Sequence, residues 1–70
     1  MINEVLYMQI RLFRIICTRH GLCAQDGIRL FERYRIWSYI EDCYELFHVS
    51  GDESVADEID ALLMKKGAFA

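Results

Sequence analysis

The sequence has no proline and only four glycines among its 70 residues. Proline breaks helices and glycine destabilises their interiors, so the scarcity of both favours a chain that is mostly helical. Because 54% of the residues are hydrophobic, the composition also argues against a disordered or low-complexity chain. A chain of this length can bury only one small core, so we expect a single helical domain covering residues 1–70.

Cysteines are few, and their number is odd, so they cannot all form disulfides within the chain; they are Cys17, Cys23 and Cys43. Free thiols are typical of a reducing compartment. The N-terminus lacks the basic start of a signal peptide, and its first apolar stretch is interrupted by Gln9, Arg11 and Arg14. We therefore expect a cytoplasmic protein that does not contact the membrane.

Lysine is scarce, and the charges are distributed unevenly. Residues 1–35 carry six arginines and three acidic residues, whereas residues 36–70 carry two lysines and eight acidic residues. This gives the first half a charge of +3 and the second half a charge of −6. Such a distribution can favour packing of one half on the other or can steer a charged partner, but it is not the basic surface typical of a nucleic-acid-binding protein.

Hydrophobic periodicity and capping signals predict an all-α fold, a compact bundle of four short helices. These helices are expected at about residues 3–20, 24–33, 37–47 and 52–66. Asn3 is a suitable N-cap for the first helix, and Gly21 follows its last turn. Ser50 and Glu53 fit a capping box before the fourth helix, and Gly67 is placed to end that helix.

Gly27 lies inside the second predicted helix, where glycine costs about 1 kcal/mol relative to alanine. This cost indicates either a close helix contact or a weak first turn. The third predicted helix has an apolar face rich in aromatic residues, which we expect to form much of the core; these are Trp37, Tyr39, Tyr44 and Phe47.

The apolar residues of the first predicted helix spread over roughly 220° of its circumference, at about 100° per residue. An arc of this width exceeds what one side of a helix needs to cover a small core. Such a helix must be either central in the fold or shared with another chain. Because a chain of 70 residues has little interior in which to hide this surface, we expect the helix to pair with a second copy of the chain or with another protein. The residues expected at the interface are Leu6, Ile10, Phe13 and Cys17.

Several short motifs from Leu30 onward form an ordered set. They are Leu30-Phe31-x-x-Tyr34, Tyr39-Ile40-Glu41, Tyr44-Glu45-x-x-His48, Gly51-x-Glu53 and Asp57-Glu58-Ile59-Asp60. This set resembles the bacterial domain-of-unknown-function family 3791, and the similarity covers most of the chain from Leu22 onward. Two positions depart from the family pattern. Cys23 stands where a serine or threonine helix cap is more common, and Phe47 replaces a leucine.

The resemblance implies a small helical protein without known catalysis. Members of this family are often encoded near a gene that looks like an ADP-ribosyltransferase-type toxin. The resemblance therefore implies an antitoxin-like accessory role, with such a toxin as a protein partner.

A zinc site is one alternative, because Cys17, His20 and Cys23 are regularly spaced and Cys43 could supply a fourth ligand. The two residues Cys17 and Cys43 nevertheless lie on apolar helix faces, where cysteine usually serves as a small hydrophobic residue. We expect neither a bound metal nor any other cofactor.

Nucleophilic catalysis would need a cysteine oriented beside a histidine. Cys43 and His48 point about 140° apart if both lie on one helix. A pair formed by Cys23 and His48 stays open, but nothing in the sequence orients the histidine as a base. We therefore expect that the protein is not an enzyme.

DNA binding through a helix-turn-helix is a third alternative, with Arg29, Arg33 and Arg35 contacting phosphates. The solvent face of the candidate recognition helix argues against it, because that face is acidic and would repel the DNA backbone. Its residues are Ser38, Glu41, Asp42 and Glu45.

The acidic residues that begin the fourth predicted helix lack the pattern of a calcium loop and fit a solvated helix face. Within that face, Asp57 and Asp60 are expected to contact a partner. His48 fits a helix C-terminus, where a partly charged imidazole is favourable, and the resemblance keeps a role in partner binding open. We therefore expect a protein–protein interaction module, a homodimer or a complex with another protein.

Overall fold

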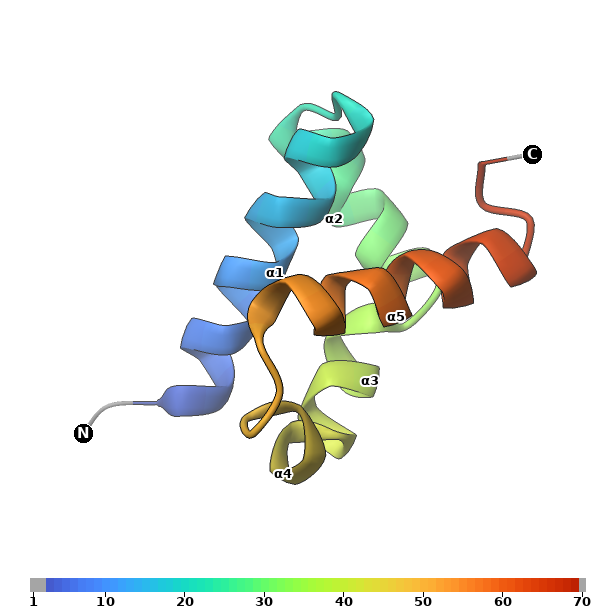
Figure 1. The fold of residues 1–70 in the computed structure, drawn as a ribbon. Coiled ribbons are helices and arrows are strands. Elements are labelled where there is room, and N and C mark those ends of the chain that lie inside the picture. Colours follow the sequence, from blue (N-terminus) through green and yellow to red (C-terminus); the bar gives the residue numbers. More distant parts are fainter. Residues whose placement is uncertain (1–2, 70) are drawn as a thin grey trace.

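The first helix begins and ends where its own sequence predicts. The computed structural model describes residues 3–69, and helix α1 spans Glu4–His20 (Figure 1). The Asn3 side chain accepts a hydrogen bond of 3.0 Å from the backbone N–H of Leu6, which confirms the N-cap. Gly21 has a left-handed conformation with φ of 62°, and its backbone N–H bonds back to the last turn of the helix. Both ends therefore follow from local chemistry.

Helix α2, Ala24–Arg33, runs back alongside α1 (Figure 1). Cys23 replaces the usual serine or threonine cap, and its Sγ accepts a hydrogen bond of 3.5 Å from the N–H of Asp26. Gly27 faces α1 so closely that a Cβ atom there would overlap Cys17 Sγ and lie 2.9 Å from the ring of Phe13. The glycine is therefore explained by close packing of two helices.

Arg35 makes the turn between α2 and the next helix. It is the one residue other than glycine with a positive φ among residues 3–69, with φ of 56° and ψ of 38°. The left-handed conformation brings Cβ close to the following carbonyl, so it is unfavourable for arginine. The chain holds it because Ile36, the first residue of the next helix, is fully buried.

Replacing Arg35 with glycine should raise the free energy of unfolding by about 0.5 to 1 kcal/mol, because relief of the left-handed strain exceeds the cost of extra freedom in the unfolded chain. The measurement is urea denaturation followed by circular dichroism. Arg35→Ala is the control, because it removes the same side chain and keeps the Cβ atom. Equal stabilisation by both variants would show that the side chain, and not the backbone conformation, is responsible.

The prediction of one helix over residues 37–47 was wrong, because the chain forms two. Helix α3 spans Ile36–Asp42, helix α4 spans Tyr44–Phe47, and Cys43 lies at the break. In a straight helix, residues eight apart are separated by about 12 Å along the axis. The rings of Tyr39 and Phe47 are only 5.5 Å apart. The break therefore bends the chain, so that Phe47 stays in the core with only 2% of its surface exposed.

Helix α5 spans Asp52–Lys65, and its start differs from the predicted capping box. Gly51 is the N-cap and no side chain caps the helix, while Ser50 Oγ donates a hydrogen bond of 3.5 Å to the carbonyl of Leu46. Glu53 cannot reach back to Ser50 because its carboxylate binds Arg19 at 2.6 Å. The predicted stop is confirmed: Gly67 has φ of 78°, and the N–H of the following residue bonds back to the Leu63 carbonyl.

The helices surround one hydrophobic cluster. Helix α1 contacts α2, α3 and α5, and α5 crosses it on the way to the C-terminus (Figure 1). The cluster consists of Met8, Leu12, Ile16, Phe31, Ile36, Ile40, Phe47, Val55, Ala56, Ile59 and Leu63. Residues 3–69 contain five helices and no strand, which confirms the all-α fold class. None of these helices has the length and hydrophobicity needed to cross a bilayer.

Candidate functional site

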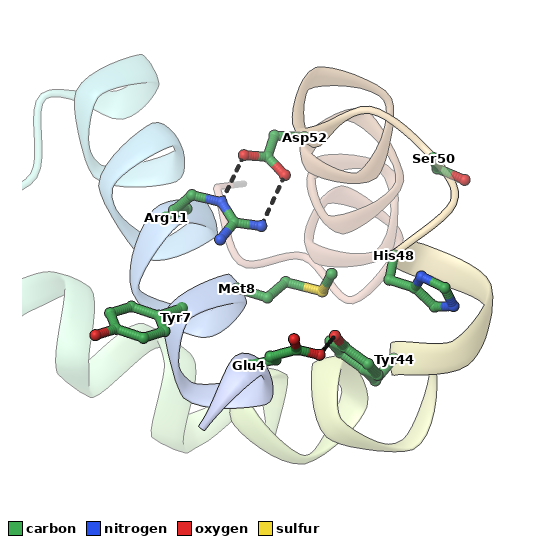
Figure 2. Close-up of a pocket in the computed structure, with 8 residues that line it drawn as sticks. All are labelled: Glu4, Tyr7, Met8, Arg11, Tyr44, His48, Ser50 and Asp52. Carbon is green, nitrogen blue, oxygen red and sulfur yellow. Dashed lines mark hydrogen bonds and ion pairs between the residues drawn. The ribbon is translucent and has the colours of Figure 1, made fainter. Parts of the chain in front are cut away.

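A polar cleft opens where the N-terminal half of α1 meets α4 and the start of α5 (Figure 2). Its volume is about 420 Å³. Met8 lies between the two sides of the cleft and is almost fully buried (Figure 2). The lining residues are Glu4, Tyr7, Met8, Arg11, Tyr44, His48, Ser50 and Asp52. The cleft thus combines an apolar base with a rim of charged and aromatic groups.

Two polar pairs join α1 to the second half of the chain across this cleft. On one side, Arg11 Nε and Nη2 donate to the two carboxylate oxygens of Asp52, at 2.9 and 3.4 Å. On the other side, the hydroxyl of Tyr44 donates to Glu4 at 2.8 Å. The His48 ring stacks on Tyr44, with ring centroids 5.4 Å apart. The Arg11–Asp52 pair and the Tyr44–Glu4 pair each link residues about forty positions apart in the sequence.

The hydrogen bond to Glu4 is the largest of the causes that raise the pKa of Tyr44 above its ordinary value of 10.0. Desolvation and the negative charges of Glu4 and Glu45 act in the same direction, and the positive charge of Arg11 opposes them. The pKa of Arg11 is itself raised, chiefly by its hydrogen bond to Asp52. At neutral pH the rim therefore holds a neutral tyrosine, and Glu4, which accepts its hydrogen bond, forms no ion pair with an arginine or lysine among residues 3–69.

Folding stability should fall as the pH rises above about 10, because folded Tyr44 holds its proton more tightly than the unfolded chain does. The contribution is complete below that pH and is lost as the pH passes the raised pKa of the folded state. Tyr44→Phe should show a shallower decline in unfolding free energy, measured by urea denaturation from about pH 8 to pH 11. Some decline should remain, because burial also raises the pKa values of Tyr39 and Cys17. Equal slopes for the two proteins would contradict the role of Tyr44.

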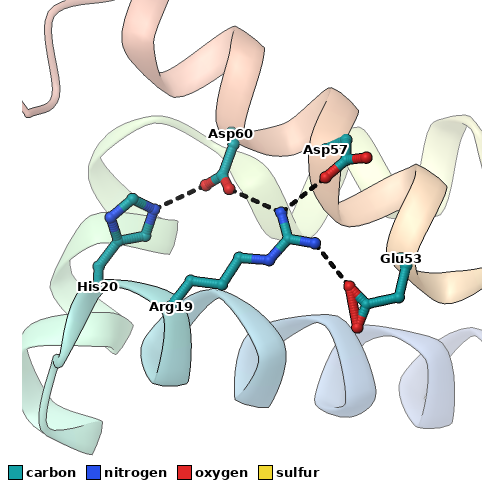
Figure 3. A network of polar contacts seen from close by, with 5 residues as sticks. All are labelled: Arg19, His20, Glu53, Asp57 and Asp60. Atoms are coloured by element: carbon teal, nitrogen blue, oxygen red, sulfur yellow. Dashed lines mark hydrogen bonds and ion pairs between the residues drawn. The ribbon is translucent and has the colours of Figure 1, made fainter.

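A second polar cluster joins the end of α1 to α5 (Figure 3). The Arg19 guanidinium contacts three carboxylates, and these hydrogen bonds raise the pKa of Arg19. The distances are 2.6 Å to Glu53, 2.9 Å to Asp57 and 2.9 Å to Asp60. His20 Nε2 lies 2.8 Å from the other oxygen of Asp60. The basic and acidic halves of the chain thus pack on one another, one of the two outcomes that the charge distribution allows.

This cluster corrects the view of the α5 acids as a purely solvated face, because their spacing of three and four residues aligns them with Arg19. The two acids predicted to meet a partner differ in accessibility. The Asp57 side chain is 72% exposed, whereas that of Asp60 is 19% exposed and already has two partners in the chain. Of the two, Asp57 has more surface free for a partner.

The zinc candidates have other contacts. His20 binds Asp60 and stacks on Phe69, with ring centroids 4.0 Å apart. The Cys23 thiol caps α2, and Cys17 packs beside Gly27, where burial raises the pKa of its thiol. Within residues 3–69, no three histidine, cysteine or acidic side chains are grouped in a way that could hold a metal ion. Among the described residues, the structure therefore does not gather these candidate ligands into a group of three.

The predicted interface residues of α1 divide into two groups. Leu6 and Ile10 are exposed to 49% and 44%, and Tyr7 beside them is exposed to 55%. Phe13 is partly buried and packs on the core, with its ring 5.4 Å from that of Trp37, and Cys17 is also partly buried. We call Leu6, Tyr7 and Ile10 the α1 strip. Of the four predicted residues, only Leu6 and Ile10, in the N-terminal half of α1, are exposed to solvent.

His48 was noted in the sequence, and the structure places it at the C-terminal end of α4, as predicted. Its Nε2 lies 3.7 Å from Glu45 of the same turn, and its side chain is 43% exposed. It also lines the cleft, which the sequence did not indicate. The other cleft residues were missed because they lie far apart in the chain and belong to no motif. Only their opposite charges offered a signal, and charge alone does not select partners.

The fold is a small all-α domain. Its two polar sites, the cleft and the Arg19 cluster, both join α1 to the second half of the chain. Residues 8–66 match the family described as "Protein of unknown function (DUF3791)". Because this match covers most of the chain, the protein belongs to that family, as the resemblance of its motifs predicted. No curated protein and no solved structure matches the chain.

Proposed function

We propose that this protein is a protein–protein interaction module and that the α1 strip is its binding surface. The observation that carries the proposal is the exposure of Leu6, Tyr7 and Ile10 on one side of one helix, at 49%, 55% and 44%. Adjacent large apolar side chains at a protein surface commonly mark binding sites. Removing such apolar surface from water favours association.

Other exposed apolar residues form a weaker case. Leu46 and Val49 are more exposed, but they lie on a four-residue helix and the turn that follows it. Met64 lies near the end of α5. The α1 strip belongs instead to the longest helix, which is anchored on α2, α3 and α5. A rigid support lowers the entropy lost on binding, so this strip is the better binding surface.

The proposed role is binding in the cytoplasm and not catalysis. The three free cysteines suit a reducing compartment, and none of the cleft residues is a cysteine nucleophile. An antitoxin-like accessory role, with an ADP-ribosyltransferase-like toxin as partner, rests on the family resemblance of the motifs. The toxin and a second copy of this chain are the partners that we expect to find bound.

Ile10→Glu should abolish partner binding and leave the fold intact, because the residue is on the surface and glutamate suits a helix. The experiment is purification of the tagged protein from its own cell, with bound proteins and untagged copies quantified by mass spectrometry. Met64→Glu places the same charge on another exposed apolar position and should bind like the wild type. Equal binding by wild type and Ile10→Glu, or no stoichiometric partner for the wild type, would overturn the proposal.

A further inference from the structure

One unpaired charge of each sign remains on α1 after the intramolecular ion pairs are formed. Arg14 is exposed and forms no ion pair with any residue from 3 to 69, whereas Arg11 and Arg19 are both paired. Glu4, on the rim of the cleft, is bound by the Tyr44 hydroxyl but by no cation in the same part of the chain. A carboxylate has about four acceptor positions, so Glu4 can bind further donors.

These two charges flank the α1 strip. At about 100° per residue, Leu6, Tyr7, Ile10 and Arg14 lie within an arc of roughly 100° on the helix. Tyr7 belongs to the strip and is also one of the residues that line the cleft, although its ring points away from Glu4 and Tyr44 (Figure 2). A partner on the strip that reaches past the edge of α1 would meet the Glu4 carboxylate beside the Tyr44 ring, which is a favourable site for a guanidinium group.

The positions of the charges suit a second copy of this chain in one orientation. Consider two antiparallel α1 helices related by a twofold axis that passes near Ile10. Measured along the helix, Arg14 of the second copy then lies about 6 Å from this axis, and Glu4 of the first copy lies about 9 Å from it on the same side. An arginine side chain easily spans the difference of about 3 Å. In a parallel pair, each Arg14 would face the other Arg14, and like charges would meet.

We infer that two copies of this protein pair through antiparallel α1 strips, and that Arg14 of each copy enters the Glu4–Tyr44 cleft of the other. This inference rests on the proposed function of the α1 strip and names its partner. The twofold symmetry makes the contact occur twice, so each copy both gives an arginine and receives one. The cleft is then completed by a residue that its own chain cannot supply.

Exchange of the charges tests the pairing, with the dissociation constant of the full-length protein measured by analytical ultracentrifugation under reducing conditions. Glu4→Arg and Arg14→Glu should each weaken the dimer by roughly tenfold or more, because each homodimer then has two like-charge contacts. An equal mixture of the two variants should form a heterodimer close to the wild type in affinity, because both opposite-charge contacts return. Arg29→Glu, the same charge change at an exposed site on α2, should leave the affinity unchanged.

Circular dichroism of each variant tests whether it folds, which matters because Glu4→Arg also loses the hydrogen bond from Tyr44. If that variant unfolds, Glu4→Gln, which keeps an acceptor oxygen, is combined with Arg14→Gln in a double-mutant cycle. The double variant should then dimerise as well as either single variant, whereas additive losses would overturn the pairing.

The remaining outcomes separate this inference from the proposed function. A wild type that stays monomeric at high concentration overturns the pairing, and the purification from cells still decides whether the α1 strip binds another protein. Suppose that the wild type dimerises and Ile10→Glu disrupts the dimer, but the mixture of charge variants does not regain the wild-type affinity. This result overturns the antiparallel contact and leaves the strip as the binding surface. A wild-type dimer that Ile10→Glu does not affect counts against both.

Discussion

Phe31→Ala should remove most of the stability of this protein. The Phe31 side chain is completely buried, and its ring centroid lies 5.2 Å from that of Phe13 and 4.7 Å from that of Trp37. Truncating a buried phenylalanine to alanine costs about 3 to 5 kcal/mol, since the lost contacts leave a cavity. A domain of this size has a total stability of roughly 4 to 10 kcal/mol. The variant should therefore be largely unfolded or strongly destabilised.

Urea denaturation followed by far-ultraviolet circular dichroism measures this loss. Ile28→Ala is the matched control, because it also truncates an apolar residue of α2, but one whose side chain is 43% exposed. The control should lose less than about 1 kcal/mol, since less apolar surface returns to water and no cavity forms. Similar losses for the two variants would show that Phe31 is not at the centre of the core.

Gly27→Ala should destabilise the protein, although the same change inside an ordinary helix stabilises it by about 1 kcal/mol. The new methyl group would overlap Cys17 Sγ and lie 2.9 Å from the Phe13 ring, so α1 and α2 must move apart. Overpacking of this kind costs about 1 to 3 kcal/mol, which exceeds the gain in helix propensity. The net effect should be a lower thermal midpoint and a lower free energy of unfolding.

The neighbouring cysteine provides a sharper test of this packing. Adding Cys17→Ala to Gly27→Ala removes the sulfur that the methyl group overlaps, so the double variant should be more stable than the sum of the two single effects predicts. Gly51→Ala is the control for overlap, because no atom lies within 4 Å of the position where its Cβ would be; it should cost only the weaker capping of α5 by alanine, and Cys17→Ala should not relieve that cost. A stabilising effect of Gly27→Ala alone would contradict the close contact of the two helices.

The helices could be predicted well wherever their ends depend on local chemistry. Asn3, Gly21 and Gly67 act within one turn of the residues that they cap, so their effect can be read from neighbouring positions. The break at Cys43 could not be predicted in this way. Residues 37–47 have continuous helical periodicity, and the break is set by the position that Phe47 must reach in the core.

The candidate sites were less predictable than the helices. The excess of apolar surface on the first helix was visible in its periodicity, but the sequence could not show that Phe13 and Cys17 pack inside the protein while Leu6 and Ile10 stay exposed. The difference depends on where α2 and α3 pack against α1. The capping box failed for a similar reason, because Arg19 competes for Glu53 from more than thirty residues away.

The sequence by itself determined the helical class, most helix ends, the family and the opposite charges of the two halves, because each depends on nearby residues, on composition or on the order of motifs. Only the tertiary structure decided which charges meet. It pairs Arg19 with the acids of α5 and Arg11 with Asp52, places Tyr44 against Glu4, and leaves the α1 strip uncovered. These contacts join residues about forty positions apart, and their partners are selected by helix packing and not by any local pattern.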